Sequence, residues 1–350
     1  MTEQTAQKHR PTRSRWLRII IWIVSILLTI VVGVAAALTL SPWPGALLVR
    51  ALFSIGGSKM SSALEKHVPG GVTSMLNQQY GADGPDTTLD VFFPTKIKDT
   101  SAALPTVVWI HGGGWVAGDK SEIANYLKIL ASKGYTVVGP NYSIAPGEQY
   151  PTPIVQVMQA LAYVQKNAAK LHIDPTQIVL AGDSAGAQIA SQVAAITTND
   201  EYADLVGIGS TLNPDNLVGT VLNCGAYDAH AFNLNTGGIA GVFIRTVVWS
   251  YLGSRNPSQA KLTEMSVVDN VDGQFPPTYI SGGNADPLTP QGKEMAKKLQ
   301  SLGVSVDSLF YPADYTPKLP HEYQFNLDDS AGQNALDRTV AFLEAHTSNQ

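Results

Sequence analysis

The 350-residue chain has one cysteine, Cys224, and therefore cannot form an intramolecular disulfide bond. This absence does not identify a compartment, because many exported proteins have no disulfide. The sequence also has no His-Glu-x-x-His string, no paired cysteines and no phosphate-binding glycine motif, which are the usual marks of zinc and nucleotide sites. We therefore expect neither a metal nor an organic cofactor.

Basic residues are scarce outside the first 18 positions. Those positions hold five of the 23 Lys and Arg residues but only one of the 28 Asp and Glu residues, which leaves 18 basic and 27 acidic residues in the remainder. An acidic globular part disfavours nucleic acid as a partner. The basic head is better explained as a signal for membrane topology.

A long apolar run does occur, from Ile19 to Leu40, with 22 residues and no charge. A helix of that length, at about 1.5 Å per residue, spans a hydrocarbon core of about 30 Å. Arg15 and Arg18 precede the run, and no comparable basic cluster follows it. The positive-inside rule then predicts a cytoplasmic head at 1–18, a signal-anchor helix at 19–40 and an extracytoplasmic remainder. The alternative is a secreted protein, released by cleavage of a signal peptide near 35–37.

Strands and helices alternate after a linker and N-terminal cap at 41–85. The expected strands are 88–93, 105–110, 135–138, 177–181, 217–222, 278–281 and 305–311, and the expected helices are 121–133, 153–171, 185–197, 290–302 and 332–346. Such alternation over 86–347 predicts an α/β fold, with a mostly parallel sheet covered by helices on both faces. The stretch at about 228–267 interrupts the pattern and is expected to be a cap insertion.

The string GDSAG at 182–186 is the first chemical signal. It follows an apolar strand and precedes an Ala-rich helix, which is the strand-turn-helix setting of a serine nucleophile. Such a turn exposes the hydroxyl of Ser184 and leaves the N–H of Ala185 free at a helix N-terminus. In isolation the string also fits a serine that only caps the helix.

The string HGGGW at 111–115 follows a buried strand directly. Glycines there can present backbone N–H groups to an oxyanion, and we assign Gly112 and Gly113 to that role together with Ala185. A phosphate-cradling turn is the alternative, but no Lys-Ser or Lys-Thr ending supports it. His111 is expected to anchor the loop. Trp115 and Asp183 are candidate substrate-binding residues.

These motifs resemble the hormone-sensitive-lipase-like and related carboxylesterase families of the α/β-hydrolase fold. The resemblance extends over about 86–346 and includes LDV at 89–91, GDK at 118–120, NYSIAP at 141–146 and IDP at 173–175. The loop after the glycines is also similar to feruloyl and acetyl-xylan esterases and to kynurenine formamidases. Ser143 and Ala187 depart from residues common in these families, Arg and Gly respectively, which leaves the subfamily open.

The fold places a catalytic acid and then a histidine on loops after later strands. Asp286 follows the strand at 278–281 and matches the position of the acid in these families. Asp228, Asp272 and Asp314 are weaker candidates because they lie before that strand or one strand too late. His321 follows the last strand and is the expected base. The neighbouring Glu322 is expected to be a surface carboxylate.

The sequence therefore predicts a membrane-anchored serine esterase that acts on short-chain acyl esters through an acyl-enzyme. The substrate is expected to be a small-molecule ester. Three alternatives remain open: an envelope acyltransferase, a deacetylase with the same residues, and a non-catalytic binding protein on a hydrolase scaffold.

Overall fold

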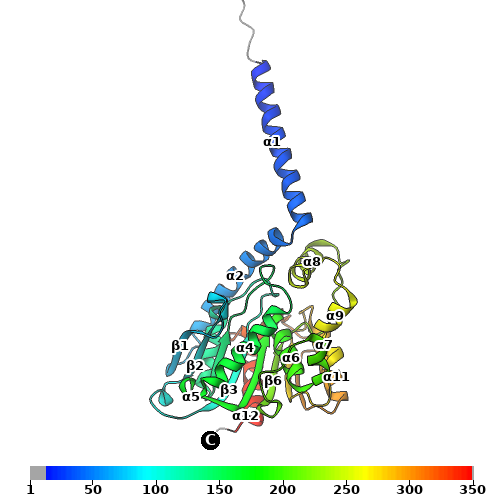
Figure 1. Cartoon of the computed structure of the whole chain (residues 1–350). Coiled ribbons are helices and arrows are strands. Elements are labelled where there is room, and N and C mark those ends of the chain that lie inside the picture. The colour runs from blue at the N-terminus through cyan, green and yellow to red at the C-terminus, as the bar shows by residue number, and fades with distance from the viewer. Residues whose placement is uncertain (1–12, 349–350) are drawn as a thin grey trace, which may run out of the picture.

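The structure, a computed structural model, describes residues 13–348 (Figure 1). Residues 1–12 of the proposed basic head lie outside the described residues. Helix α1, Arg13–Leu40, extends away from the rest of the chain in Figure 1. The most apolar 18-residue window of its segment Arg15–Leu40 has a mean hydropathy of 2.9 and no buried residue. This helix has the length and composition of a membrane span or a signal sequence.

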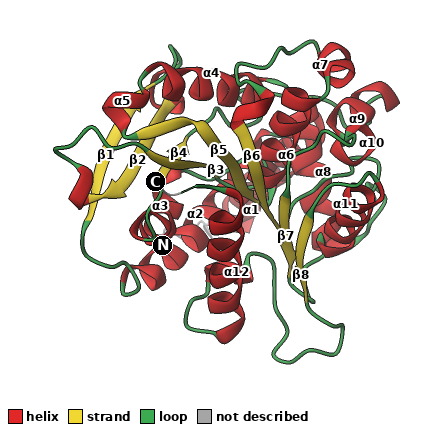
Figure 2. Ribbon diagram, turned by 90° about the horizontal axis from the view of Figure 1, so that it is seen from below, coloured by secondary structure: helices red, strands yellow, loops and turns green. Residues whose placement is uncertain are grey.

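The described residues form one eight-stranded sheet in the order β1-β2-β4-β3-β5-β6-β7-β8 (Figure 2). Strands β3 to β8 pair in parallel, whereas β2 is antiparallel to both β1 and β4. The strands are β1 Val72–Gln79, β2 Thr88–Pro94, β3 Leu104–Ile110, β4 Thr136–Pro140, β5 Ile173–Asp183, β6 Leu217–Asn223, β7 Thr278–Gly282 and β8 Val306–Phe310. The predicted α/β architecture is confirmed.

Helices cover both faces because the central strands are apolar on both sides. In β3, Val107 and Trp109 face one core, and Val108 and Ile110 face the other. Helices α3 and α12 pack on the first face, and α4, α6 and α11 on the second. The helices after α1 are α2 Trp43–Glu65, α3 Lys120–Ser132, α4 Thr152–Lys166, α5 Ala168–Leu171, α6 Ala185–Thr198, α7 Asp200–Val206, α8 Gly238–Leu252, α9 Gln259–Met265, α10 Val267–Asn270, α11 Thr289–Ser301 and α12 Ser330–His346. Short 3-10 turns occur at η1 Gly84–Thr87, η2 Thr95–Ile97, η3 Pro214–Asn216 and η4 Tyr323–Phe325.

The segment assigned to a linker and cap at 41–85 contains two regular elements instead. Helix α2 is continuous through Gly56 and Gly57, and β1 adds an edge strand, so the sheet begins before residue 86. Strand β1 is polar, half exposed and bulged between Met75 and Gln78, which removes the alternation that marks a strand in sequence.

The insertion between β6 and β7 holds α8, α9 and α10, and α8 packs beside α2. These two helices lie at the end of the sheet nearest α1 (Figure 1). The carboxyl ends of parallel strands are the usual place for a site in such folds.

The chain also differs from expectation at 153–171. One helix was expected there, but the structure has two, α4 and α5, which are separated at Asn167.

Candidate active site

Ser184 occupies the sharp turn between β5 and α6. Its φ of 54° lies in the left-handed region, a conformation that costs about 1–3 kcal/mol and recurs at functional sites. The turn also needs a close approach of backbones. A Cβ on Gly186 would collide with the carbonyl oxygen of Ile110, so glycine is required for α6 to start beside β3.

The side chains of Ser184, His321 and Asp286, which the sequence predicts to be the catalytic residues, lie next to one another in the structure. His321 Nε2 lies 2.9 Å from Ser184 Oγ, and His321 Nδ1 lies 2.9 Å from Asp286 Oδ1. Because the carboxylate accepts from Nδ1, that nitrogen carries the proton of the neutral imidazole, and Nε2 can then accept the serine O–H. Asp286 Oδ1 also accepts from the N–H of Leu288 at 2.9 Å, which fixes the carboxylate.

Cys224, Asp286 and His321 present potential metal-ligand atoms within 4.8 Å of one another. Their chemistry fits a hydrogen-bonded site better than a metal. Burial raises the pKa of the Cys224 thiol and keeps it protonated, and its Sγ donates to Gln324 Oε1 at 3.3 Å. Both nitrogens of His321 already have partners.

One expectation about the glycine loop is wrong. The N–H of Gly112 donates to Asp183 Oδ2 at 2.8 Å, and it is therefore not available to an oxyanion. Asp183 Oδ1 accepts from Trp109 Nε1 at 2.8 Å, so its buried carboxylate holds the loop and is not free to contact substrate. Gly113, the next residue, remains a candidate donor to the oxyanion. The N–H groups of Gly113 and Gly114 have no protein acceptor among residues 13–348.

His111 anchors this loop, as expected. Its Nδ1 donates to the carbonyl of Gly112 at 2.8 Å, and its ring stacks on Tyr142 at 4.4 Å. Tyr142 in turn donates its hydroxyl to the carbonyl of His111 at 2.9 Å. Burial lowers the pKa of His111, so the ring is neutral and serves a structural role.

An apolar cavity of about 530 Å³ opens on one side of Ser184. Trp115, a candidate substrate-binding residue, lines it and is held by a 4.9 Å stack on Tyr251 and by donation of Nε1 to Gln188 Oε1 at 3.1 Å. Further walls come from α2 and the insertion, including Phe53, Phe232, Phe243, Ile244 and Val247.

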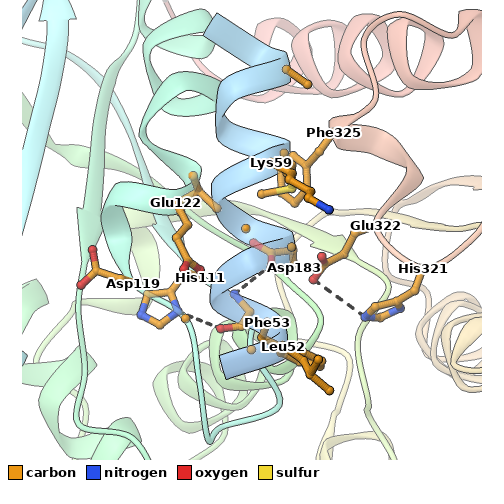
Figure 3. Close-up of a pocket in the computed structure, with 18 of the residues that line it drawn as sticks. Leu52, Phe53, Lys59, His111, Asp119, Glu122, Asp183, His321, Glu322 and Phe325 are labelled. Carbon is orange, nitrogen blue, oxygen red and sulfur yellow. Dashed lines mark hydrogen bonds and ion pairs between the residues drawn. The ribbon is translucent and has the colours of Figure 1, made fainter. Parts of the chain in front are cut away.

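A second cavity of about 540 Å³ lies on the other side of His321, between α2 and the glycine loop. Figure 3 shows α2 crossing this space, with Asp119 and Glu122 on one side and Glu322 and His321 on the other. Burial and the neighbouring carboxylates raise the pKa of Glu122 to about 7. The lining of this cavity includes four carboxyl groups, from Asp119, Glu122, Asp183 and Glu322, whereas the first cavity has none; we call it the acidic cavity.

Glu322 is not the surface carboxylate that the sequence suggested. Its Oε1 lies 3.8 Å from His321 Nε2, and its side chain is only 30% exposed. Burial, followed by the charge of Glu322, raises the pKa of Asp183 well above its usual range. Burial lowers the pKa of His321, but Asp286, Glu322 and Asp183 together outweigh burial and raise it to about 9.

Several residues of the site have no sequence signal. Phe53 lies 131 positions before Ser184 and belongs to α2, and Phe243 belongs to the insertion; their rings meet at 5.7 Å above the cavity. Gln188 and Tyr142 act through hydrogen bonds that only the folded chain reveals. In sequence alone, a bulky apolar residue in a cap segment cannot be distinguished from a residue of the hydrophobic core, because its neighbours in the fold are not known.

Comparison with known proteins places this geometry in a family. A model described as the alpha/beta hydrolase fold matches residues 107–322. Carboxylesterase NlhH of Mycobacterium tuberculosis is 30% identical over 269 residues, which cover 75% of this chain and 80% of that protein. The chain spans 60% of an alpha/beta hydrolase of Acanthamoeba polyphaga mimivirus, with 28% identity over 219 residues and 61% of this chain covered.

A solved structure shares the fold. Esterase B from Lactobacillus Rhamnosis, inhibited by a tributyrin phosphonate, has a TM-score of 0.72 at 24% identity, with 86% of this chain and 96% of that chain covered. The chain belongs to the α/β-hydrolase family and is a carboxylesterase-type member of it. The resemblance to that group, inferred from the two glycine-containing motifs, is thereby confirmed.

Proposed function

We propose that this protein is a membrane-anchored serine esterase that hydrolyses short-chain carboxylic esters. The observation that carries the proposal is the chain of contacts from Ser184 Oγ through His321 to Asp286, with 2.9 Å at each step. Carboxylesterase and esterase relatives support the reaction type.

The reaction follows from the protonation states. Neutral His321 accepts the proton of Ser184 as the serine oxygen attacks the ester carbonyl carbon. Asp286, buried and hydrogen-bonded to Nδ1, stabilises the imidazolium. The tetrahedral intermediate collapses, the alkoxide leaves with the proton from His321, and an acyl-enzyme remains. Water then attacks the acyl-enzyme by the same sequence and releases the acid.

The oxyanion is assigned to the N–H groups of Gly113 and Ala185, with Gly114 as a third donor. Gly113 has φ +114°, and its carbonyl accepts from Val116 and Ala117 at 3.2 and 3.0 Å, which fixes the peptide planes around it. A fixed donor is worth more to a transition state than a mobile one, because it needs no reorganisation.

The apolar cavity takes the acyl group. A volume of about 530 Å³ walled by Trp115, Phe232 and Phe243 suits a short or medium acyl chain. The named inhibitor of Esterase B, a tributyrin phosphonate, is consistent with short acyl groups in a related fold.

Four variants test the proposal on an acyl-length series of nitrophenyl esters. Ser184→Ala should abolish turnover, and His321→Ala and Asp286→Asn should each lower kcat by about 10³-fold or more. Asp228→Asn is the matched control and should keep wild-type turnover. Near-ultraviolet circular dichroism confirms that each variant is folded. Wild-type turnover in Ser184→Ala would refute the proposal.

The anchor and its direction are part of the proposal. Arg15 and Arg18 at the start of α1 favour a cytoplasmic N-terminus and an extracytoplasmic hydrolase. Protease added outside intact cells should then digest the hydrolase domain, and the mass of the purified protein should include residues 19–40. A mature chain that begins after residue 37 would instead indicate signal cleavage and secretion.

A further inference from the structure

Two helices that border the apolar cavity also expose apolar side chains beside the end of α1. We call this set the α2–α8 apolar face; its members are Trp43, Leu47, Leu48, Leu52 and Ile55 in α2 and Ile239 and Val242 in α8. Ile239 is the most exposed member of this set, with 90% of its surface accessible. Helices α2 and α8 contact each other, and a large exposed apolar surface on a folded domain marks an interaction site.

Helix α2 keeps charge away from this face. Arg50 is the one charged residue between Trp43 and Ser58, and it turns into the domain. Its Nε donates to the carbonyl of Val116 at 2.9 Å and its Nη2 to the carbonyl of Ala145 at 3.1 Å. The outward face of this part of α2 therefore presents only uncharged side chains, as hydrocarbon requires.

The position of α1 indicates that a membrane covers the α2–α8 apolar face. Helix α1 ends at Leu40 and α2 begins at Trp43, with α8 on the other side of the junction (Figure 1). Arg255 Nη2 donates to the carbonyl of Leu38 at 3.0 Å, and its guanidinium lies 4.1 Å from the ring of Trp249. Tryptophan and arginine at the end of an apolar helix are typical of the membrane–water boundary.

The cavity lies behind the same two helices. Phe53 of α2 and Phe243, Ile244 and Val247 of α8 line it together with Ser184. The walls of this cavity are mainly apolar up to Ser184, so they suit an ester that enters from lipid between these helices.

We infer that the α2–α8 apolar face rests in the surface of the membrane that α1 spans, and that the substrates are esters dissolved in that lipid surface. This inference rests on the proposed esterase function. It adds the source of the substrate, namely amphiphilic or lipid esters with a short acyl group.

The test compares two esters that share one acyl group. The full chain is reconstituted in phosphatidylcholine vesicles and given either hexadecyl acetate in the bilayer or 4-nitrophenyl acetate in water. The double variant Leu48→Glu with Ile239→Glu should lower turnover of hexadecyl acetate by about tenfold or more, because charge opposes insertion of the face. Turnover of 4-nitrophenyl acetate should stay at the wild-type value, which also shows that the variant is folded. Leu205→Glu on α7, exposed but outside the face, is the matched control.

The outcomes separate the two proposals. Failure of the wild type on both esters would refute the esterase function. Hydrolysis of 4-nitrophenyl acetate without hydrolysis of hexadecyl acetate would overturn the inference alone. An equal effect of the double variant and of Leu205→Glu on hexadecyl acetate would also overturn it.

A fluorescence measurement reports the position of the face directly. Leu48→Cys carries an environment-sensitive fluorophore, since the native Cys224 is buried. Brominated phosphatidylcholine should quench this label and should not quench the same label at Leu205→Cys. No quenching at position 48, or an emission that depends on protein density instead of brominated lipid, would overturn the inference and point to a second copy as the cover.

Discussion

Asp183 Oδ2 accepts the N–H of Gly112 at 2.8 Å and thereby ties the nucleophile turn to the glycine loop. The two segments are 71 residues apart in sequence but start from neighbouring strands, β3 and β5. Because the other carboxylate oxygen accepts from Trp109 at 2.8 Å, one buried side chain holds the loop, the strand and the turn together.

Replacing Asp183 should therefore cost both stability and rate. Asp183→Ala leaves two buried donors without acceptors, and each such group costs about 1–3 kcal/mol. We expect the free energy of unfolding to fall by several kcal/mol and kcat to fall more than KM rises. Urea unfolding in detergent and steady-state kinetics check both. Asp174→Ala, at the half-buried start of β5, is the control and should change kcat little; an equal loss of kcat there would contradict the role of Asp183.

Gly113 should tolerate no side chain. Its φ is +114°, and a Cβ would collide with the carbonyl of Ala117, so Gly113→Ala must move the loop. Loss of one oxyanion donor typically costs about 10²–10³ in kcat. Gly70→Ala, where a Cβ meets nothing within 4 Å, should leave kcat unchanged. A normal kcat in Gly113→Ala would remove Gly113 from the oxyanion site.

The rate should depend on pH through His321. Only the neutral imidazole can accept the serine proton, so kcat/KM rises as pH rises through its pKa, which lies at about 9. Glu322→Gln removes one negative charge that raises this pKa, and the rising limb should therefore move to lower pH. Glu122→Gln, in the same cavity but not among the groups that raise the pKa of His321, should leave the limb in place. An unmoved limb in Glu322→Gln would contradict the assigned electrostatics.

Phe243 should set the acyl length. Its ring meets Phe53 at 5.7 Å over the apolar cavity, and Phe243→Ala removes one wall. We expect the optimum of a nitrophenyl ester series to shift toward longer chains, since a buried CH₂ group is worth about 0.8 kcal/mol once space exists for it. Phe325→Ala, on the side of the acidic cavity, is the control and should keep the wild-type optimum. The same optimum in Phe243→Ala and the wild type would place the acyl group elsewhere.

The sequence predicts most of the sheet because its central strands are apolar on both faces and each is bounded by turn residues. It also predicts the order Ser184, Asp286, His321, since that order follows from strand succession in a parallel sheet. Strand β1 is not predictable in this way, because an exposed, bulged edge strand has no apolar alternation.

The hydrogen bonds and side-chain directions within the site cannot be predicted from the sequence for a different reason. The direction of the Gly112 N–H depends on backbone angles that glycine leaves free, and only contact with Asp183 fixes it. Glu322 has a φ of 60°, a left-handed conformation that sequence does not reveal, and its Oε1 lies 3.8 Å from His321 Nε2. The walls of the cavity come from α2 and α8, whose packing against each other is a tertiary contact.

The central claim is that Ser184 is the nucleophile, and reaction with a fluorophosphonate probe followed by peptide mass spectrometry tests it most directly. The probe forms a stable bond only with a serine oxygen that a neighbouring base can deprotonate. We predict one adduct, on the peptide that contains Ser184, and none in Ser184→Ala. An adduct on another residue, or equal labelling of Ser184→Ala, would contradict the claim.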